Sequence, residues 1–177
     1  KMFYSLGFRL MSKTGIQAMI IPYGILTDTT SANLRKHIFN NHTLLKIDAF
    51  PERDNTNKRV FEDVKMSTAI IICYAAKLDL DIDIGISYDK KIENTNRMKI
   101  SINDIIKISP ELLQIPLTDK DKFKILLKVI NNAKIIKMKS ISECLTGEVD
   151  MTFAKSSLTE NNKNNKLLKG VQIDRYL

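Results

Sequence analysis

Glycine and histidine are scarce in this sequence, and their scarcity excludes several kinds of active site. The six glycines are scattered through 177 residues, and no two of them form a loop that could cradle a phosphate or a nucleoside. The two histidines, His37 and His42, have no partner of the kind that nucleophilic catalysis requires. A P-loop and zinc-ligand spacing are also missing. We therefore expect no catalytic residue, no cofactor-binding residue and no metal site in this chain.

Cysteines are few and long hydrophobic runs are missing. The longest apolar runs, such as residues 69–73, are far too short to span a bilayer. The first residues lead directly into an amphipathic pattern without the composition of a signal peptide. Cys73 and Cys144 show no metal-ligand spacing, and Cys73 lies in an apolar run that is typical of a reduced core residue. These features predict a cytoplasmic location and no membrane partner.

Positive charge is plentiful. The chain has 28 lysines and arginines against 20 acidic residues, a net charge of +8 and a pI of about 9.4. Such a balance favours a polyanionic partner, nucleic acid first. The alternative is that lysine, isoleucine and asparagine are simply common in an AT-rich genome. The 44% of hydrophobic residues can form a core, and the length suits one domain or a little more.

The first half of the sequence alternates predicted helices and strands, which is typical of an α/β fold. Four apolar residues at helical spacing predict a first helix with a buried apolar face: Phe3, Leu6, Leu10 and Met11. A second helix is expected after Thr30 or Ser31, with residues 35–37 on its exposed side. The expected strands are residues 16–21, 44–50 and 68–74, the last of them buried on both faces.

The second half of the sequence predicts short strands, one helix and irregular connections, unlike the first half. We therefore expect a domain boundary near residues 77–79. Strict alternation over residues 79–86 predicts a strand with an acidic exposed face rather than a calcium loop. Residues 100–108 fit either a strand or a short helix. Thr118 is expected to cap a helix that buries Phe123. Short strands are expected at 135–138 and 145–153, and a polar loop at 156–165.

Phe61 lies in a charged loop just before the apolar strand at 68–74. The ring either packs beneath the sheet and closes the core, or it is held at a site to meet a flat ligand such as a nucleobase. Lys58, Arg59 and Lys65 flank it and could contact phosphates beside such a ligand. Alternatively, these three cations simply form a solvated loop.

The order of these segments resembles a known family. The relevant segments are the strand Ala-Met-Ile-Ile-Pro at 18–22, the helix at 31–38, Ile-Asp-Ala-Phe at 47–50, and Val-Phe at 60–61 before Ser-Thr-Ala-Ile-Ile-Ile at 67–72. This series is similar to the later half of the catalytic domain in adenine-specific DNA methyltransferases of restriction–modification systems. The closest group includes type II enzymes and those fused to an endonuclease. Residues 141–148 and 168–176 resemble the start of the family's target-recognition region.

The resemblance implies an α/β fold with two parts. Residues 1–78 would form the later half of a Rossmann-like methyltransferase sheet, and residues 79–177 a linker and a partial α+β recognition region. The whole enzyme would transfer a methyl group from S-adenosylmethionine to the adenine amino group in double-stranded DNA. The family's glycine-rich cofactor loop and its Asn- or Asp-Pro-Pro-aromatic motif are absent, since residues 21–24 read Ile-Pro-Tyr-Gly. We therefore expect a fragment that is inactive alone and binds no S-adenosylmethionine by itself.

The resemblance also assigns site residues. Phe61 matches the aromatic residue that stacks on the flipped adenine in this family. DNA contacts are expected from seven basic residues: Lys58, Arg59, Lys65, Lys155, Lys166, Lys169 and Arg175. Two alternatives stay open, a non-enzymatic nucleic-acid-binding specificity module and an α/β interaction domain without a DNA partner. The recognition sequence, a fused endonuclease and the oligomeric state do not follow from the sequence.

Overall fold

The computed structural model describes residues 2–94, 96–136, 138–142, 156, 158–159 and 163. The chain divides into two compact units, Lys1–Ile135 and Ile136–Leu177. In the second unit the described residues include one 3₁₀ turn, η4 (Met138–Ser140). The following description concerns the first unit.

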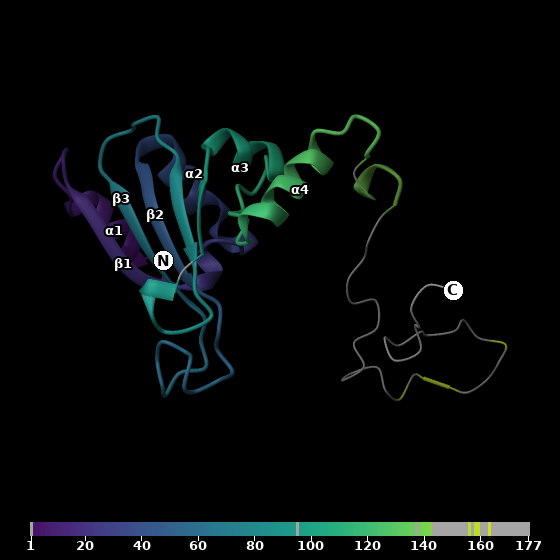
Figure 1. Ribbon diagram of the computed structural model, residues 1–177. Coiled ribbons are helices and arrows are strands. Elements are labelled where there is room, and N and C mark those ends of the chain that lie inside the picture. Colours follow the sequence, from purple (N-terminus) through teal and green to yellow (C-terminus); the bar gives the residue numbers. More distant parts are fainter. Residues whose placement is uncertain are drawn as a thin grey trace. The chain divides into compact units, whose positions relative to one another are not determined.

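The first unit is built on a mixed sheet of five strands in the order β1-β3-β2-β4-β5 (Figure 1). The strands are β1 (Ile16–Pro22), β2 (Thr43–Phe50), β3 (Thr68–Tyr74), β4 (Ile82–Ile86) and β5 (Asn96–Ile100). β3 is antiparallel to both of its neighbours, β1 and β2, whereas β2 and β4 are parallel. Consequently β1, β2 and β4 all end at the same edge of the sheet, which we call the carboxyl edge.

Helices precede β1 and β2 and follow β5, whereas no described helix separates β2, β3 and β4. The helices are α1 (Met2–Leu10), α2 (Ala32–Asn41), α3 (Ile102–Ile108) and α4 (Lys120–Ile130), with 3₁₀ turns η1 (Tyr23–Ile25), η2 (Thr29–Ser31) and η3 (Ile92–Asn94). Ser101 caps α3 by accepting a hydrogen bond from the amide of Asp104. Asp119, and not the predicted Thr118, caps α4 by accepting one from the amide of Lys122. Each cap satisfies a backbone donor that the helix leaves unpaired.

The hydrophobic core lies on one face of the sheet. Ile47, Ala49 and Ile84 are fully buried there, and α1 and α2 lie on that side of the strands (Figure 1). The opposite face is more open, because Ile16 and Ile20 of β1 are exposed. β3, expected to be buried on both faces, instead buries alternate residues fully and its other residues mostly in part. The described helices thus leave one face of the sheet partly exposed.

The first helix is confirmed, but its predicted buried face is wrong. Phe3 and Leu10 are 80% and 77% exposed, whereas Tyr4 and Phe8 are buried. The Tyr4 hydroxyl lies 3.1 Å from the sulfur of Cys73 on β3, which gives the phenol a polar partner inside the core. That contact orients the Tyr4 side of α1 toward the sheet.

The predicted exposure of Arg35 on α2 is also wrong. Arg35 is 2% exposed, and its guanidinium donates to the carbonyl of Ile25 at 2.8 Å and to that of Leu112 at 3.0 and 2.8 Å. Burial of this charge is tolerated because several donors are paired with carbonyl oxygens. The side chain thereby ties α2 to the segment before α4.

The segment from residue 79 to 108 resolves into short elements. Asp79 and Asp81 precede β4, so only Asp83 of the predicted acidic face lies on a strand. Residues 100–108, which fitted a strand or a helix, contain the last residue of β5 and all of α3. The sheet continues beyond residues 77–79, since β4 pairs with β2 and β5 with β4. The assignment of residues 1–78 and 79–177 to two functional parts remains a prediction.

The predicted strand at 135–138 is wrong where the structure describes it. Ile135 and Ile136 lie in no strand, and Met138 begins η4. The predicted strands at 145–153 lie outside the described residues, as does most of the polar loop at 156–165.

Candidate functional site

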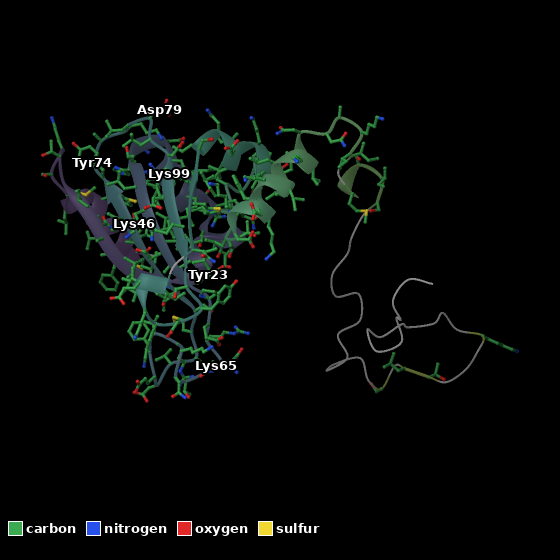
Figure 2. All side chains as sticks on the ribbon, viewed as in Figure 1. Tyr23, Lys46, Lys65, Tyr74, Asp79 and Lys99 are labelled. Carbon is green, nitrogen blue, oxygen red and sulfur yellow. The ribbon has the colours of Figure 1, made fainter. Side chains whose placement is uncertain are left out.

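The carboxyl edge of the sheet carries the loop that contains Phe61. Ligands of open α/β sheets bind in the crevice outside the carboxyl ends of the strands. Residues 51–67 leave β2 at this edge and return to β3 at the same edge, forming the long loop below the sheet in Figure 1. Figure 2 shows Lys65 in this loop and Tyr23 at the nearby edge, with Asp79 at the opposite end of the sheet. Phe61 is therefore presented where this fold class binds its ligands.

Hydrogen bonds fix both ends of this loop. The Ser67 hydroxyl donates to the carbonyl of Pro51 at 2.7 Å, which joins the two ends of the loop. The amide of Tyr23 donates to the carbonyl of Ser67 at 3.0 Å and attaches the loop to β1. Near the start of the loop, the Glu52 carboxylate accepts from the amides of Asp54 and Asn55. These backbone donors lower the pKa of Glu52, because they stabilise its ionised form.

Phe61 itself is 43% exposed. The ring is therefore not a core residue, and the first of its two predicted explanations does not describe this structure. Arg59 donates from Nη2 to the carbonyl of Glu62, next to Phe61. Lys90, from the loop that follows β4, lies 3.4 Å from the Glu62 carboxylate. Glu62, next to Phe61, thus contacts one residue of the same loop and one residue of the loop after β4, while part of the Phe61 ring remains accessible. Its role in stacking on a base remains a prediction.

The three cations that flank Phe61 differ in their surroundings. Lys58 is exposed, whereas Arg59 is half-buried. The buried Nε of Arg59 has no hydrogen-bond partner among the described residues. The ammonium of Lys65 lies 2.7 Å from the carboxylate of Asp54 in an exposed ion pair. A ligand phosphate would thus compete with a carboxylate for Lys65, and DNA contact by these three residues remains a prediction.

Two tyrosines at the carboxyl edge were missed by the sequence analysis. Tyr23 follows β1 directly, and Tyr88 lies two residues beyond β4 and is exposed. Burial and the proximity of Tyr88 raise the pKa of Tyr23. Tyr88, Asn96, Thr118 and other residues line a cavity of about 290 Å³ at this edge. An aromatic residue shortly after a predicted strand is the sequence signal that could have identified both tyrosines.

Lys155, Lys166, Lys169 and Arg175 lie outside the described residues, and their DNA-binding role remains a prediction. His42 precedes β2 at the opposite edge of the sheet and bonds through Nδ1 to the carbonyl of Ala75 at 2.7 Å.

The described residues lack two further features. No group of three or more metal-ligating side chains occurs there. No helix in that part of the chain is long and apolar enough to cross a membrane.

Comparison with known proteins gives a likeness in structure. No protein-family model matches the sequence, and no curated protein matches it. The structure is similar to a modification subunit of a putative type I restriction enzyme from Vibrio vulnificus YJ016, with a TM-score of 0.52, 19% identity and coverage of 70% of this chain. It is also similar to the M protein of the type I restriction enzyme EcoKI, with a TM-score of 0.51, 11% identity and coverage of 86%.

The chain spans 32% and 46% of the lengths of these two proteins. At such low identity, the likeness concerns the fold. The predicted fold class is thereby confirmed, since a mixed five-stranded α/β sheet is present and is similar to the methyltransferase folds of restriction–modification enzymes. This chain has a fold found in the modification subunits of restriction enzymes.

Proposed function

We propose that this chain is part of a DNA methyltransferase of a restriction–modification system that modifies the amino group of adenine. The observation that carries the proposal is the position of Phe61, a partly exposed ring at the carboxyl edge of a sheet with the fold of modification subunits. Exposure leaves the ring available for a flat ligand. The family resemblance of the segments around it supports the target adenine as that ligand.

Phe61 would act on a base that has left the DNA duplex. The amino group of adenine cannot be reached by an enzyme inside the stacked helix, so the nucleotide must be extruded. Stacking on an aromatic ring is worth about 1–3 kcal/mol per base and offsets part of the unpairing cost. Phe61 is therefore a base-holding residue, and the polar residue that orients the amino group lies outside this chain.

S-adenosylmethionine is the methyl donor in this proposal, and we expect its site to lie outside this chain. At the carboxyl edge, β1 continues into the turn η1 and β2 into Pro51, and neither connection is glycine-rich. A nucleoside cofactor needs a loop where the backbone can approach closely. The cofactor site would thus come from another segment of the protein, and this chain alone would be inactive.

Double-stranded DNA is the partner that the charge of the chain favours. Lys58, Arg59 and Lys65 would contact phosphates beside the extruded base, and the four basic residues of the C-terminal region would add further contacts. Phosphate contacts release counterions, so binding would weaken steeply as the salt concentration rises.

The proposal is tested with the whole protein that contains this chain. Purified protein is incubated with duplex DNA and S-adenosylmethionine that carries a labelled methyl group, and the modified nucleoside is identified by mass spectrometry. We expect N6-methyladenine in a defined sequence. Methylation of cytosine alone would overturn the adenine assignment. Salt-sensitive DNA binding with no methyl transfer under any condition would instead support a non-enzymatic specificity module.

The same assay addresses the type of enzyme. Two of the similar structures come from a putative type I restriction enzyme and from the type I enzyme EcoKI. We propose a type II enzyme, with or without a fused endonuclease, which methylates DNA as a single polypeptide. Activity that appears only after a separate specificity subunit is added would overturn the type II assignment while leaving the methyltransferase assignment intact.

A further inference from the structure

A groove of about 600 Å³ lies between β5 and α4. Three consecutive residues of β5 line it, Arg97, Met98 and Lys99, together with Asp83 of β4, whose carboxylate lies 2.9 Å from the Arg97 guanidinium. Four residues of α4 line it from the other side: Lys120, Phe123, Lys124 and Leu127. Consecutive strand residues point to opposite faces, so a groove lined by all three follows the edge of the strand. The spacing of the helix residues places them in one stripe along α4.

The edge of β5 in this groove is open. β5 ends the strand order of the sheet and pairs with β4 alone among the described strands. Half of the backbone amides and carbonyls of an edge strand point away from its single neighbour. Such an edge can pair with an additional extended segment, whose main chain supplies the missing hydrogen bonds.

The rim of the groove is positively charged, and its floor is apolar. Lys99 and Lys120 are exposed, and neither forms an ion pair with any residue that the structure describes. Lys124 is exposed and lies 3.5 Å from the carboxylate of Asp121. Met98 and Phe123 are buried beneath them. The groove thus combines an apolar contact surface with unpaired cations.

We propose that this groove binds an extended acidic segment of a partner protein, which adds to the sheet beside β5. Side chains alternate between the two sides of a strand, so a segment with alternating apolar and acidic residues would suit both parts of the groove. Its apolar side chains would contact Phe123 and Leu127, and its carboxylates would face Lys99 and Lys120. A neutral strand would desolvate these lysine charges without pairing them, and a basic strand would repel them.

DNA fits the groove less well than a peptide. A phosphate backbone would use the lysines but would gain little from the apolar floor. It would also leave the outward amides and carbonyls of β5 without strand partners. The inference concerns a protein partner and does not depend on the methyltransferase proposal.

The test uses a fluorescently labelled peptide of alternating valine and glutamate, with blocked termini, and the full chain. Binding is followed by anisotropy, and hydrogen exchange identifies the protected amides. We expect binding with new protection in β5 and not in β1, the other edge strand. A peptide with lysine in place of glutamate, and a glutamate peptide methylated on alternate amides, should each bind at least about tenfold more weakly.

Charge reversal locates the binding surface. Lys99→Glu and Lys120→Glu should each weaken binding about tenfold, whereas Lys36→Glu, an equal change at an exposed position of α2, should leave it unchanged. Equal binding of the glutamate and lysine peptides, or no effect of Lys99→Glu, would overturn the proposal. Protection of β5 by duplex DNA, with no binding of the glutamate peptide, would assign the groove to DNA and overturn it as well.

Discussion

The guanidinium of Arg97 on β5 reaches over β4 to the carboxylate of Asp48 on β2, with 2.5 Å between Nη1 and Oδ1. Gly85 pairs with Asp48 on one side and with Arg97 on the other, so the three residues form a row across the sheet. A Cβ atom at Gly85 would lie 2.5 Å from Arg97 Nη1 and 3.0 Å from Asp48 Oδ1. Asp48 is only 2% exposed, and its burial depends on this arginine and on Lys46 at 3.2 Å.

Loss of this ion pair should destabilise the fold. Arg97→Met leaves the buried Asp48 with one partner, and we expect the free energy of unfolding to fall by about 1–3 kcal/mol. Adding Asp48→Leu should recover part of the loss, since an apolar pair needs no charge partner. Urea denaturation measures both effects. Arg53→Met, which removes an exposed ion pair with Asp54, is the control and should change stability little.

Failure of the second substitution to recover any stability would contradict this account. In that case the cost of Arg97→Met would come from lost packing of the arginine stem and not from an unpaired carboxylate.

Phe61 should contribute little to stability. Because its ring is partly exposed, Phe61→Ala should lower the free energy of unfolding by less than about 1 kcal/mol. Phe39 on α2 is 5% exposed, and Phe39→Ala should cost about 3–5 kcal/mol. Comparable losses in thermal or urea unfolding would return Phe61 to the core and remove the basis for its proposed role.

In the whole protein, Phe61→Ala should reduce methyl transfer while Phe61→Tyr retains it. The loss of stacking corresponds to about 1–3 kcal/mol, or roughly a 5- to 150-fold lower kcat/KM. Binding of S-adenosylmethionine, measured by calorimetry, should not change. Phe3→Ala, which truncates an exposed ring on α1, is the matched control and should leave methyl transfer unaffected. Equal activity of the Phe61→Ala and parent proteins would contradict the base-holding role.

Arg35 should hold the segment before α4 in place. Arg35→Leu removes the donors to the carbonyls of Ile25 and Leu112 and should lower the free energy of unfolding by about 1–3 kcal/mol. Hydrogen exchange should become faster at the amide of Ile115, which donates to the carbonyl of Leu26. The exposed neighbour substitution Lys36→Leu should change neither quantity. Unchanged exchange at Ile115 would show that other contacts hold the segment before α4 in place without Arg35.

Cys73 should be protected from alkylation. Burial raises the pKa of its thiol to about 11, and the hydrogen bond with Tyr4 offsets only part of this shift. A raised pKa stabilises the native state below the unfolded value, near 9.0, and this contribution is lost as the pH rises through about 11. In a Cys144→Ser variant, iodoacetamide should therefore modify the unfolded chain from pH 9.0 upward but not the native chain. Equal rates in the two states would contradict this burial.

Sequence periodicity located most elements of the first unit but assigned some of their faces incorrectly. The largely apolar segments at 16–21, 44–50 and 68–74 are strands, because segments of this length suit a strand and are too short for a typical helix. In α1, hydrophobicity favoured Phe3 and Leu10, whereas the hydroxyl–thiol contact between Tyr4 and Cys73 turns the helix the other way. No local pattern reports a contact between residues so far apart in the chain.

The burial of Arg35 and part of the site at the carboxyl edge could likewise not be predicted from the sequence. An arginine within a helix is exposed by default, and only the distant carbonyl of Leu112 makes its burial possible. Phe61 was identified because it interrupts a charged loop, but Tyr23 and Tyr88 reach the same edge only through the strand order. The resemblance to methyltransferases supplied a role for Phe61 and none for the tyrosines.

The place of β3 between β1 and β2 has a consequence for how the chain folds. β1 and β2 come first in the sequence, yet neither pairs with the other, and both pair with β3. The pairing of Ile16 with Tyr74 must close a long loop before it gains hydrogen bonds. The entropy lost in closing this loop slows the pairing. Until β3 has been synthesised, β1 and β2 of a nascent chain therefore have no strand partner. A kinetic experiment should find that β1 docks onto the sheet only after the β2–β3 hairpin has formed.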